Sequence, residues 1–151
     1  MTESEKIYNE LRKKHQLPDY SYMEQELEIS DIESRQLLKH ITIKIGEKLE
    51  FLTHMLEDVL QPEAVHSMHE SKHLSDLQRK QIYELYKKMM SMNRRIVELS
   101  LLRSDEEDAN FIRSFMAEWK NIKPELIGFV STIKSSWESE TEVDEKVRYV
   151  G

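Results

Sequence analysis

Residues 75–103, SDLQRKQIYELYKKMMSMNRRIVELSLLR, contain the pattern that decides the fold of this chain. Large apolar residues recur there at alternating steps of three and four: Ile82, Leu85, Met89, Met92, Ile96 and Leu99. That alternation is the heptad seam of helices that pack side by side in a bundle. Ser75 and Gln78 have the spacing of a capping box, in which two side chains satisfy the free backbone N–H groups at a helix start. We therefore predict a long helix from Ser75 to about Arg103.

Two further long helices flank this segment along the chain. The stretch 31–61 carries a continuous apolar stripe and ends before Pro62, because the residue ahead of a proline disfavours the helical conformation. The stretch 105–138 carries an aromatic-rich stripe that keeps its phase across Pro124. We predict one kinked helix there, and a break at 121–124 is the alternative. Gly46 lies inside the first stretch, where we expect another backbone to approach closely.

Capping boxes mark the starts of the other helices. Besides Ser75/Gln78, the chain has four such pairs: Thr2/Glu5, Ser21/Glu24, Ser30/Glu33 and Ser104/Glu107. They predict short helices over 3–15 and about 22–28, and residues 62–74 form a connector. The predicted fold is all-α, an antiparallel helical bundle of three long helices plus one or two short N-terminal helices. We predict one domain over 1–138 and a flexible acidic tail over 139–151.

Composition limits the classes of function. The chain has 151 residues, no cysteine, and 34% charged residues, which is typical of helices with wide solvated faces. Without cysteine there is no disulfide framework, thiolate metal site or cysteine nucleophile. No uncharged stretch approaches the roughly 20 residues that a membrane span needs. We expect a cytoplasmic protein with no membrane partner and no cofactor.

The helix over 76–103 has a second set of large side chains outside its seam. Residues 72–103 also carry eight basic and three acidic side chains, although the whole chain has a net charge of −7. Aromatic, methionine and arginine side chains are typical of interfaces. We predict a partner-binding surface on this helix, formed by Lys80, Tyr83, Tyr86, Lys87, Met90, Arg94 and Val97. The partner is a protein or a second copy of the chain.

Three alternatives apply to the same surface. It could be a solvated face whose lysines pair with acids on neighbouring helices. Its basic stripe could bind nucleic acid, although the net negative charge opposes that role. The acidic tail could also fold back onto the stripe and shield it, because the two segments have complementary charge.

Two groups of residues are weak candidates for a metal site. Glu50 and His54 are four residues apart on one predicted helix, which is a spacing that can hold a divalent cation. The connector contains His66, His69, Glu70 and His73, but a cluster in a loop lacks the rigid scaffold of a catalytic site. We therefore predict no metal site.

The alternative to an interaction module is an enzyme. It would be a metal-dependent helical bundle that uses Glu50 and His54, or a ribonuclease-type bundle that uses Arg35 and His40. Arg35 and His40 show the Arg-x4-His spacing of a family of small helical ribonucleases, and this two-residue match establishes no resemblance to that family. The sequence favours a non-catalytic helical interaction module.

Overall fold

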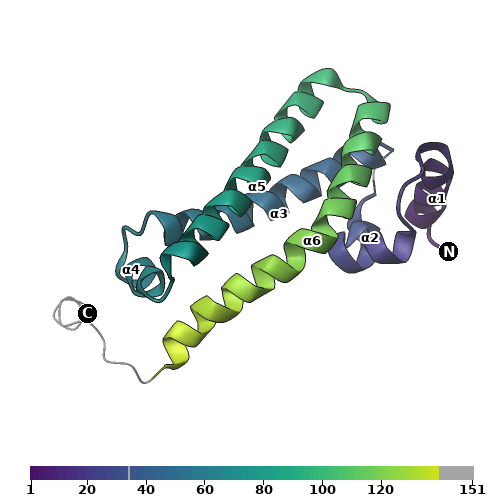
Figure 1. Cartoon of the computed structure of the whole chain (residues 1–151). Coiled ribbons are helices and arrows are strands. Elements are labelled where there is room, and N and C mark those ends of the chain that lie inside the picture. The colour runs from purple at the N-terminus through teal and green to yellow at the C-terminus, as the bar shows by residue number, and fades with distance from the viewer. Residues whose placement is uncertain (34, 140–151) are drawn as a thin grey trace. The chain divides into compact units, whose positions relative to one another are not determined.

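The computed structural model describes residues 1–33 and 35–139 of the chain. Over these residues it contains six α-helices, one short 3-10 helix and no β-strand (Figure 1). The predicted all-α fold is confirmed, and the three longest helices pack together as a bundle. None of the described helices combines the length and the apolar character that a membrane crossing requires.

The three long helices are α3 (Leu37–Leu60), α5 (Asp76–Leu102) and α6 (Asp105–Glu138). The bounds of α5 agree with the prediction because both halves of its capping box form. The Ser75 N–H donates to Gln78 Oε1 at 2.8 Å, and the Gln78 N–H donates to Ser75 Oγ at 3.1 Å. α6 continues through Pro124, so the alternative of a break at 121–124 is wrong.

α3 begins later than predicted because Ser30 does not open it. Ile29–Asp31 form the 3-10 helix η1, where the backbone N–H and the hydroxyl of Ser30 both donate to the Glu24 carboxylate at 2.7 Å. Because Ser30 is already engaged with Glu24, the predicted Ser30/Glu33 capping box is wrong. The first helical residue of α3 is Leu37.

The two short N-terminal helices are α1 (Glu3–His15) and α2 (Tyr20–Leu27). α1 has its predicted bounds, and the Glu5 N–H donates to the Thr2 hydroxyl at 3.2 Å. α2 begins earlier than predicted because Asp19 caps it instead of Ser21, with Asp19 Oδ1 accepting from the Tyr22 N–H at 2.9 Å. That backbone hydrogen bond stabilises the ionised form and lowers the pKa of Asp19.

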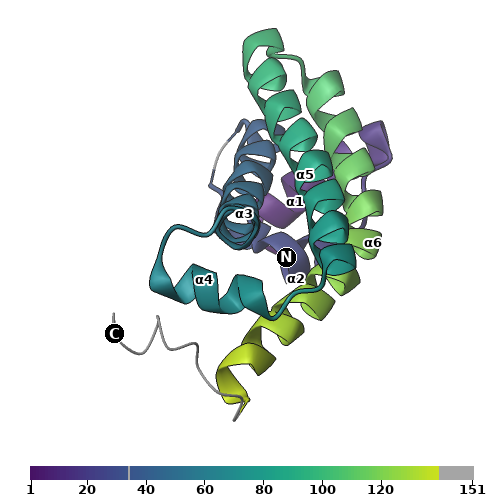
Figure 2. The same cartoon turned by 60° about the vertical axis from the view of Figure 1, so that its left-hand side comes forward.

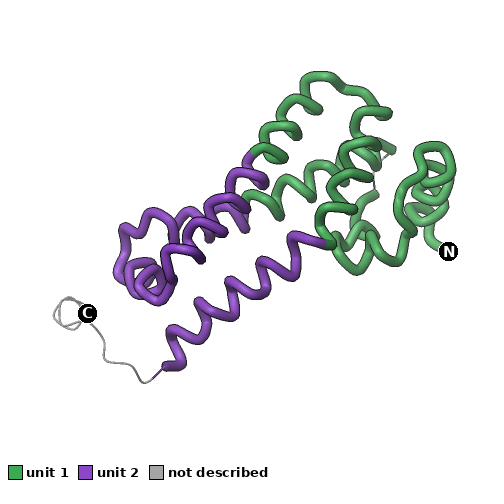
Figure 3. The backbone as a smooth tube through the Cα atoms, in the orientation of Figure 1, with its two compact units in different colours: residues 1–50, 91–120 green, residues 51–90, 121–151 purple. Residues whose placement is uncertain are grey.

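The contacts within the chain divide it into two compact units (Figure 3). Unit 1 comprises residues 1–50 and 91–120, and unit 2 comprises residues 51–90 and 121–151. Each unit combines distant stretches of sequence, because α3, α5 and α6 each have one part in unit 1 and the other part in unit 2. The prediction of a single domain over 1–138 stays a prediction. The tail beyond residue 139 lies outside the described residues.

Unit 1 has a core to which α1, α2, α3, α5 and α6 all contribute. Tyr8 and Met23 are fully buried, and the Tyr8 hydroxyl donates to the Pro18 carbonyl. Burial raises the pKa of Tyr8 far above its ordinary value, so the phenol stays protonated. The buried side chains from the long helices in this unit include Leu38, Ile41, Ile45, Leu49, Leu99, Ile112, Phe115 and Trp119.

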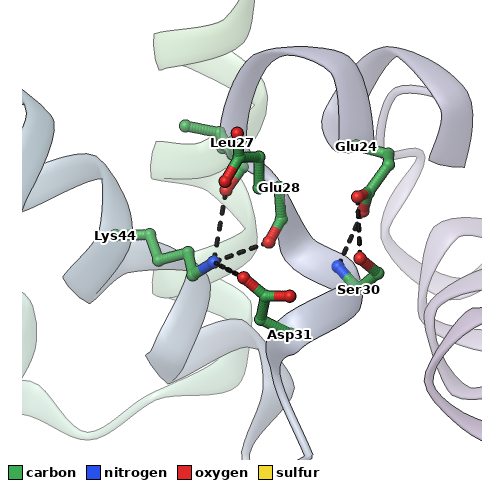
Figure 4. A network of polar contacts seen from close by, with 6 residues as sticks. All are labelled: Glu24, Leu27, Glu28, Ser30, Asp31 and Lys44. Carbon is green, nitrogen blue, oxygen red and sulfur yellow. Dashed lines mark hydrogen bonds and ion pairs between the residues drawn. The ribbon is translucent and has the colours of Figure 1, made fainter.

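A lysine of α3 holds the end of α2 (Figure 4). Lys44 Nζ donates to the carbonyl oxygens of Glu28 and Leu27 at 2.6 and 3.4 Å, and it lies 3.7 Å from Asp31 Oδ2. The last carbonyls of a helix have no partner within that helix and form the negative end of its dipole. The ammonium group therefore joins α2 and η1 to α3.

Part of the predicted connector over residues 62–74 is a helix of unit 2, α4 (Val65–Lys72). Ser67 supports its first turn, since the Ser67 hydroxyl donates to the Ala64 carbonyl and accepts from the Ala64 N–H. α4 lies beside the C-terminal turns of α6 (Figure 2). The core of this unit consists of Leu56, Val59, Leu74, Ile82, Leu85, Met89, Ile122, Leu126, Phe129 and Ile133.

Gly46 of α3 faces a side chain and not a backbone. A Cβ atom at this position would lie 3.5 Å from Ile96 Cδ1 and 3.7 Å from Ile96 Cγ2. Both distances are ordinary van der Waals contacts. The expectation of a close backbone approach is therefore wrong.

Candidate functional site

The predicted partner-binding surface on α5 begins in unit 2. Its residues there are Lys80, Tyr83, Tyr86, Lys87 and Met90, which we call the α5 face. Tyr83 is 50% exposed, whereas its neighbour Ile82 on the seam side is fully buried. Lys87 Nζ lies 5.7 Å from the centroid of the Tyr83 ring, within the range of a cation–π contact. Tyr86 and Met90 are half-buried, so the α5 face has a partly covered apolar floor and an exposed aromatic edge.

Arg94 and Val97, the other two predicted binding residues, belong to unit 1. Val97 is 52% exposed, and Arg94 is exposed. They lie farther along the same helix, α5. The α5 face therefore consists of residues of unit 2 alone.

Several basic residues of the 72–103 segment have structural partners. In unit 2, Arg79 Nη2 donates to the Ser71 carbonyl at the end of α4. In unit 1, Arg95 Nη2 donates to Glu107 Oε2 at 2.6 Å, and Arg95 Nη1 lies 3.7 Å from Glu98 Oε1. These contacts support in part the alternative in which the basic residues stabilise the fold.

The histidines of the predicted connector lie on and beside α4, where His69 packs against Trp137 of α6 and His73 packs against His69. His69 Nε2 donates to the Ser136 carbonyl at 2.9 Å, and the His69 ring lies 4.1 Å from the Trp137 ring, centroid to centroid. His73 Nδ1 donates to the His69 carbonyl at 2.9 Å. Trp137 Nε1 donates to Glu70 Oε2 at 2.9 Å. The cluster therefore joins α4 to the end of α6.

The histidine cluster uses one ring nitrogen of two histidines to hold carbonyl oxygens. Nε2 of His69 and Nδ1 of His73 donate to carbonyl oxygens, so only the other ring nitrogen of each could act as a metal ligand, and His66 is exposed. Across residues 1–33 and 35–139, no three His, Asp or Glu side chains converge in a way that could hold a metal ion.

The other enzyme candidates lie on α3 or just before it. Glu50 lies one helical turn before His54 on α3, and His54 Nε2 is 4.0 Å from Asp58 Oδ2. Arg35 precedes α3, and His40 is a half-buried residue in the first turns of that helix. Arg35 lines two clefts of unit 1, and His40 is not among the residues that line either of them. Neither of these two clefts brings Arg35 and His40 together.

One of these clefts, with a volume of about 390 Å³, lies between the start of α3 and the α5–α6 junction of unit 1. Its apolar wall includes Ile43, Ile96 and Leu99. Three cationic and two anionic side chains line the same cleft: Arg35, Lys39, Arg103, Asp105 and Asp108. We call this site the charged cleft. Its volume lies within the range of about 300–1,000 Å³ that is usual for small-molecule sites.

Asp108 is the unusual member of the charged cleft because it is only 6% exposed. Burial raises its pKa, Asp105 raises it further, and the charges of Lys39 and Arg95 oppose the shift. Within the described part of the chain, no hydrogen bond or ion pair engages its carboxylate. A buried carboxyl group that borders a cleft without a partner is a candidate for binding or proton transfer.

Of the charged residues in this cleft, the amino-acid sequence singles out Arg35 alone, through its spacing from His40. Asp108 does leave a signal in the sequence, because it lies three and four residues before the buried Phe111 and Ile112. It therefore continues the apolar stripe of α6 with a charged residue. Lys39, Arg103 and Asp105 give no such signal, since each is exposed and is ordinary at a helix end.

Comparison of the chain with protein-family models, with curated proteins and with solved structures finds no match in any of the three. Proposals about its function therefore rest on the geometry of the described residues.

Proposed function

We propose that this chain is a non-catalytic interaction module that binds a protein partner through the α5 face. The partner that fits this face presents a helix with apolar and acidic side chains. The observation that carries the proposal is the exposure of half of Tyr83, a large aromatic side chain on a helix whose opposite seam is buried.

The chemistry of the α5 face supports a protein ligand. An exposed aromatic ring buries a large area when a partner covers it, and tyrosine loses little conformational entropy on binding. Tyr86 and Met90 beside it are half-buried and can extend the apolar contact. Lys80 and Lys87 are exposed at the rim, where charges steer a partner of opposite sign.

The same charges disfavour a two-fold dimer through this face. In a two-fold interface the same patch meets its own copy, so Lys80 and Lys87 would face a surface with the same positive charges. Like charges across an interface cost several kcal/mol unless a counter-charge lies between them. We therefore favour a different, acidic protein over a second copy, and light scattering of the purified chain distinguishes the two.

The test compares two alanine variants of α5. Tyr83→Ala removes the exposed ring of the α5 face, and Leu77→Ala removes an even more exposed side chain, 65% exposed, from another side of the same helix in the same unit. A partner is first identified by a photo-crosslinker placed at position 83, then purified and titrated against each variant. We expect Tyr83→Ala to weaken binding at least about tenfold and Leu77→Ala to leave it unchanged.

Two results would contradict the proposal. One is an equal effect of Tyr83→Ala and Leu77→Ala on the affinity for the purified partner. The other is binding to nucleic acid that falls steeply with salt and is lost in Lys87→Glu but kept in Tyr83→Ala, because such binding depends on phosphate contacts alone.

A further inference from the structure

The charged cleft of unit 1 contains both signs of charge without the ion pairs that usually neutralise them. Three cations and two carboxylates line it: Arg35, Lys39, Arg103, Asp105 and Asp108. Among the described residues, none of these side chains forms an ion pair or a hydrogen bond with another. Elsewhere in unit 1 oppositely charged neighbours do pair, as Arg95 and Glu107 show at 2.6 Å.

The position of Asp108 adds an independent observation. Its side chain is more than nine-tenths buried and borders the cleft, yet no donor of the described structure reaches its carboxylate. The carboxylate oxygens keep contact with solvent at the cleft, because the one fully buried side-chain polar atom without a partner among the described residues is His15 Nε2. A donor group on a molecule that enters the cleft can therefore reach the Asp108 carboxylate.

Arg103 gives the same cleft a positive charge, which suits the anionic group of a ligand. It follows the last residue of α5 with a left-handed backbone (φ 52°), a conformation that favours glycine. Gln16 and Glu28 end α1 and α2 in the same conformation, so this backbone is an ordinary helix ending, and it is the guanidinium group of Arg103 that bears on the cleft. Together with Lys39 and Arg35 it supplies donors for a phosphate, phosphonate or carboxylate group.

We propose that the charged cleft binds a small zwitterionic molecule, whose anionic group contacts Arg35, Lys39 and Arg103 and whose ammonium group contacts Asp108 and Asp105. The carbon chain between the two groups lies against Ile96 and Leu99. This site is separate from the α5 face, and it extends the proposed function from binding a protein to binding a small molecule as well.

The test uses three compounds of matched shape: 3-aminopropylphosphonate, propylphosphonate and propylamine. The first has both charged groups, and each of the others lacks one of them. In amide NMR titrations of the full chain, we expect 3-aminopropylphosphonate to give saturable shifts confined to 35–43 and 96–108, with a Kd of about 1 mM or below. We expect each single-charge compound to bind at least about tenfold more weakly.

Two variants test the contacts at the two ends of the ligand separately. Asp108→Asn keeps the shape of the side chain and removes its charge, so we expect the affinity for 3-aminopropylphosphonate to fall about tenfold, to the level of propylphosphonate. Arg103→Gly removes a cation and relieves the left-handed backbone, so we expect weaker binding of both phosphonates in a chain that still folds. Glu63→Gln, an exposed change in unit 2, is the control and leaves both affinities unchanged.

Three outcomes would overturn the proposal. They are the absence of saturable shifts with 3-aminopropylphosphonate, equal affinities for 3-aminopropylphosphonate and propylphosphonate, and an unchanged affinity in Asp108→Asn. If Asp108→Asn does not fold, Arg103→Gly still tests the proposal. The loss of a contacting cation must weaken phosphonate binding, so an unchanged affinity in Arg103→Gly would contradict it.

Discussion

The buried carboxyl group of Asp108 lowers the stability of the folded chain and also lines the proposed binding site. A carboxylate on the apolar stripe of α6 gains nothing from packing, and burial raises its pKa because the ionised form is poorly solvated. An amide of the same shape carries no charge and avoids that penalty. Binding sites often contain such residues, whose replacement stabilises the protein.

We predict that Asp108→Asn raises the free energy of unfolding at neutral pH by about 0.5–2 kcal/mol. Because the pKa of Asp108 is raised in the folded state, the folded protein takes up its proton more readily than the unfolded chain. The penalty is therefore largest above the folded pKa and disappears below the unfolded pKa, near 3.8. The stability difference between variant and parent should shrink as the pH falls through this range.

Urea unfolding of both proteins at a series of pH values measures this difference. Glu63→Gln is the matched control, since it removes a carboxylate from an exposed position of unit 2. If the advantage of the Asp108→Asn variant were constant from neutral to acidic pH, the effect would come from packing and not from the desolvated charge.

At the scale of the helix, Gly46 is a weak point inside α3. Glycine in a helix interior costs about 1 kcal/mol relative to alanine, because its backbone loses more freedom on folding. A methyl group at this position would meet only Ile96, at 3.5 Å, which is an ordinary contact. Neither a turn nor a positive φ requires glycine here.

We predict that Gly46→Ala stabilises the chain by about 1 kcal/mol. Thermal unfolding measures the change, and Gly128→Ala is the matched control, because nothing lies within 4 Å of a Cβ at that position of α6. Gly46→Leu should lose the gain, since a larger side chain would overlap Ile96. A fall in stability for Gly46→Ala would show that α3 needs the space that glycine leaves.

At the scale of the whole chain, the acidic tail is the segment with the clearest charge complement to α5. Residues 140–151 lie outside the described residues, so the prediction that they shield the basic stripe stays a prediction. Their sequence has four acidic and two basic residues. Removing them therefore removes two net negative charges.

We predict that a chain ending at residue 139 is retained more strongly on a heparin column than a full-length chain of equal net charge. The matched chain is Glu10→Gln with Glu63→Gln, two exposed changes outside the α5 face. The extra retention should disappear in Lys87→Glu, because the shielding acts on the basic stripe. Elution of the two chains at the same salt concentration would rule out shielding.

The helix boundaries divide into those that local chemistry determines and those that it does not. Ser75 and Gln78 form their capping box because both partners lie within one turn and nothing else competes for them. Ser30 instead contacts Glu24, and Asp19 instead of Ser21 caps α2. In both wrong predictions an alternative hydrogen bond is within reach of a side chain with the correct spacing.

The helical state of α4 depends on tertiary contacts, so local sequence patterns do not predict it. Its eight residues are too few to form a stable helix alone, and its sequence is polar. Contacts of His69 with Ser136 and Trp137, and of Arg79 with Ser71, hold it in place. Partners of this kind are distant in the sequence and have no local pattern.

The amino-acid sequence by itself determined an all-α bundle, the seams of α5 and α6, and the continuation of α6 across Pro124, because apolar periodicity and capping are local properties of the chain. The tertiary structure alone decided that Asp108 is buried at the edge of a cleft, that Arg35, Lys39 and Arg103 line that cleft with it, and that Tyr83 stays half exposed. Burial and the meeting of distant charges depend on how helices pack, and packing is a property of the folded chain as a whole.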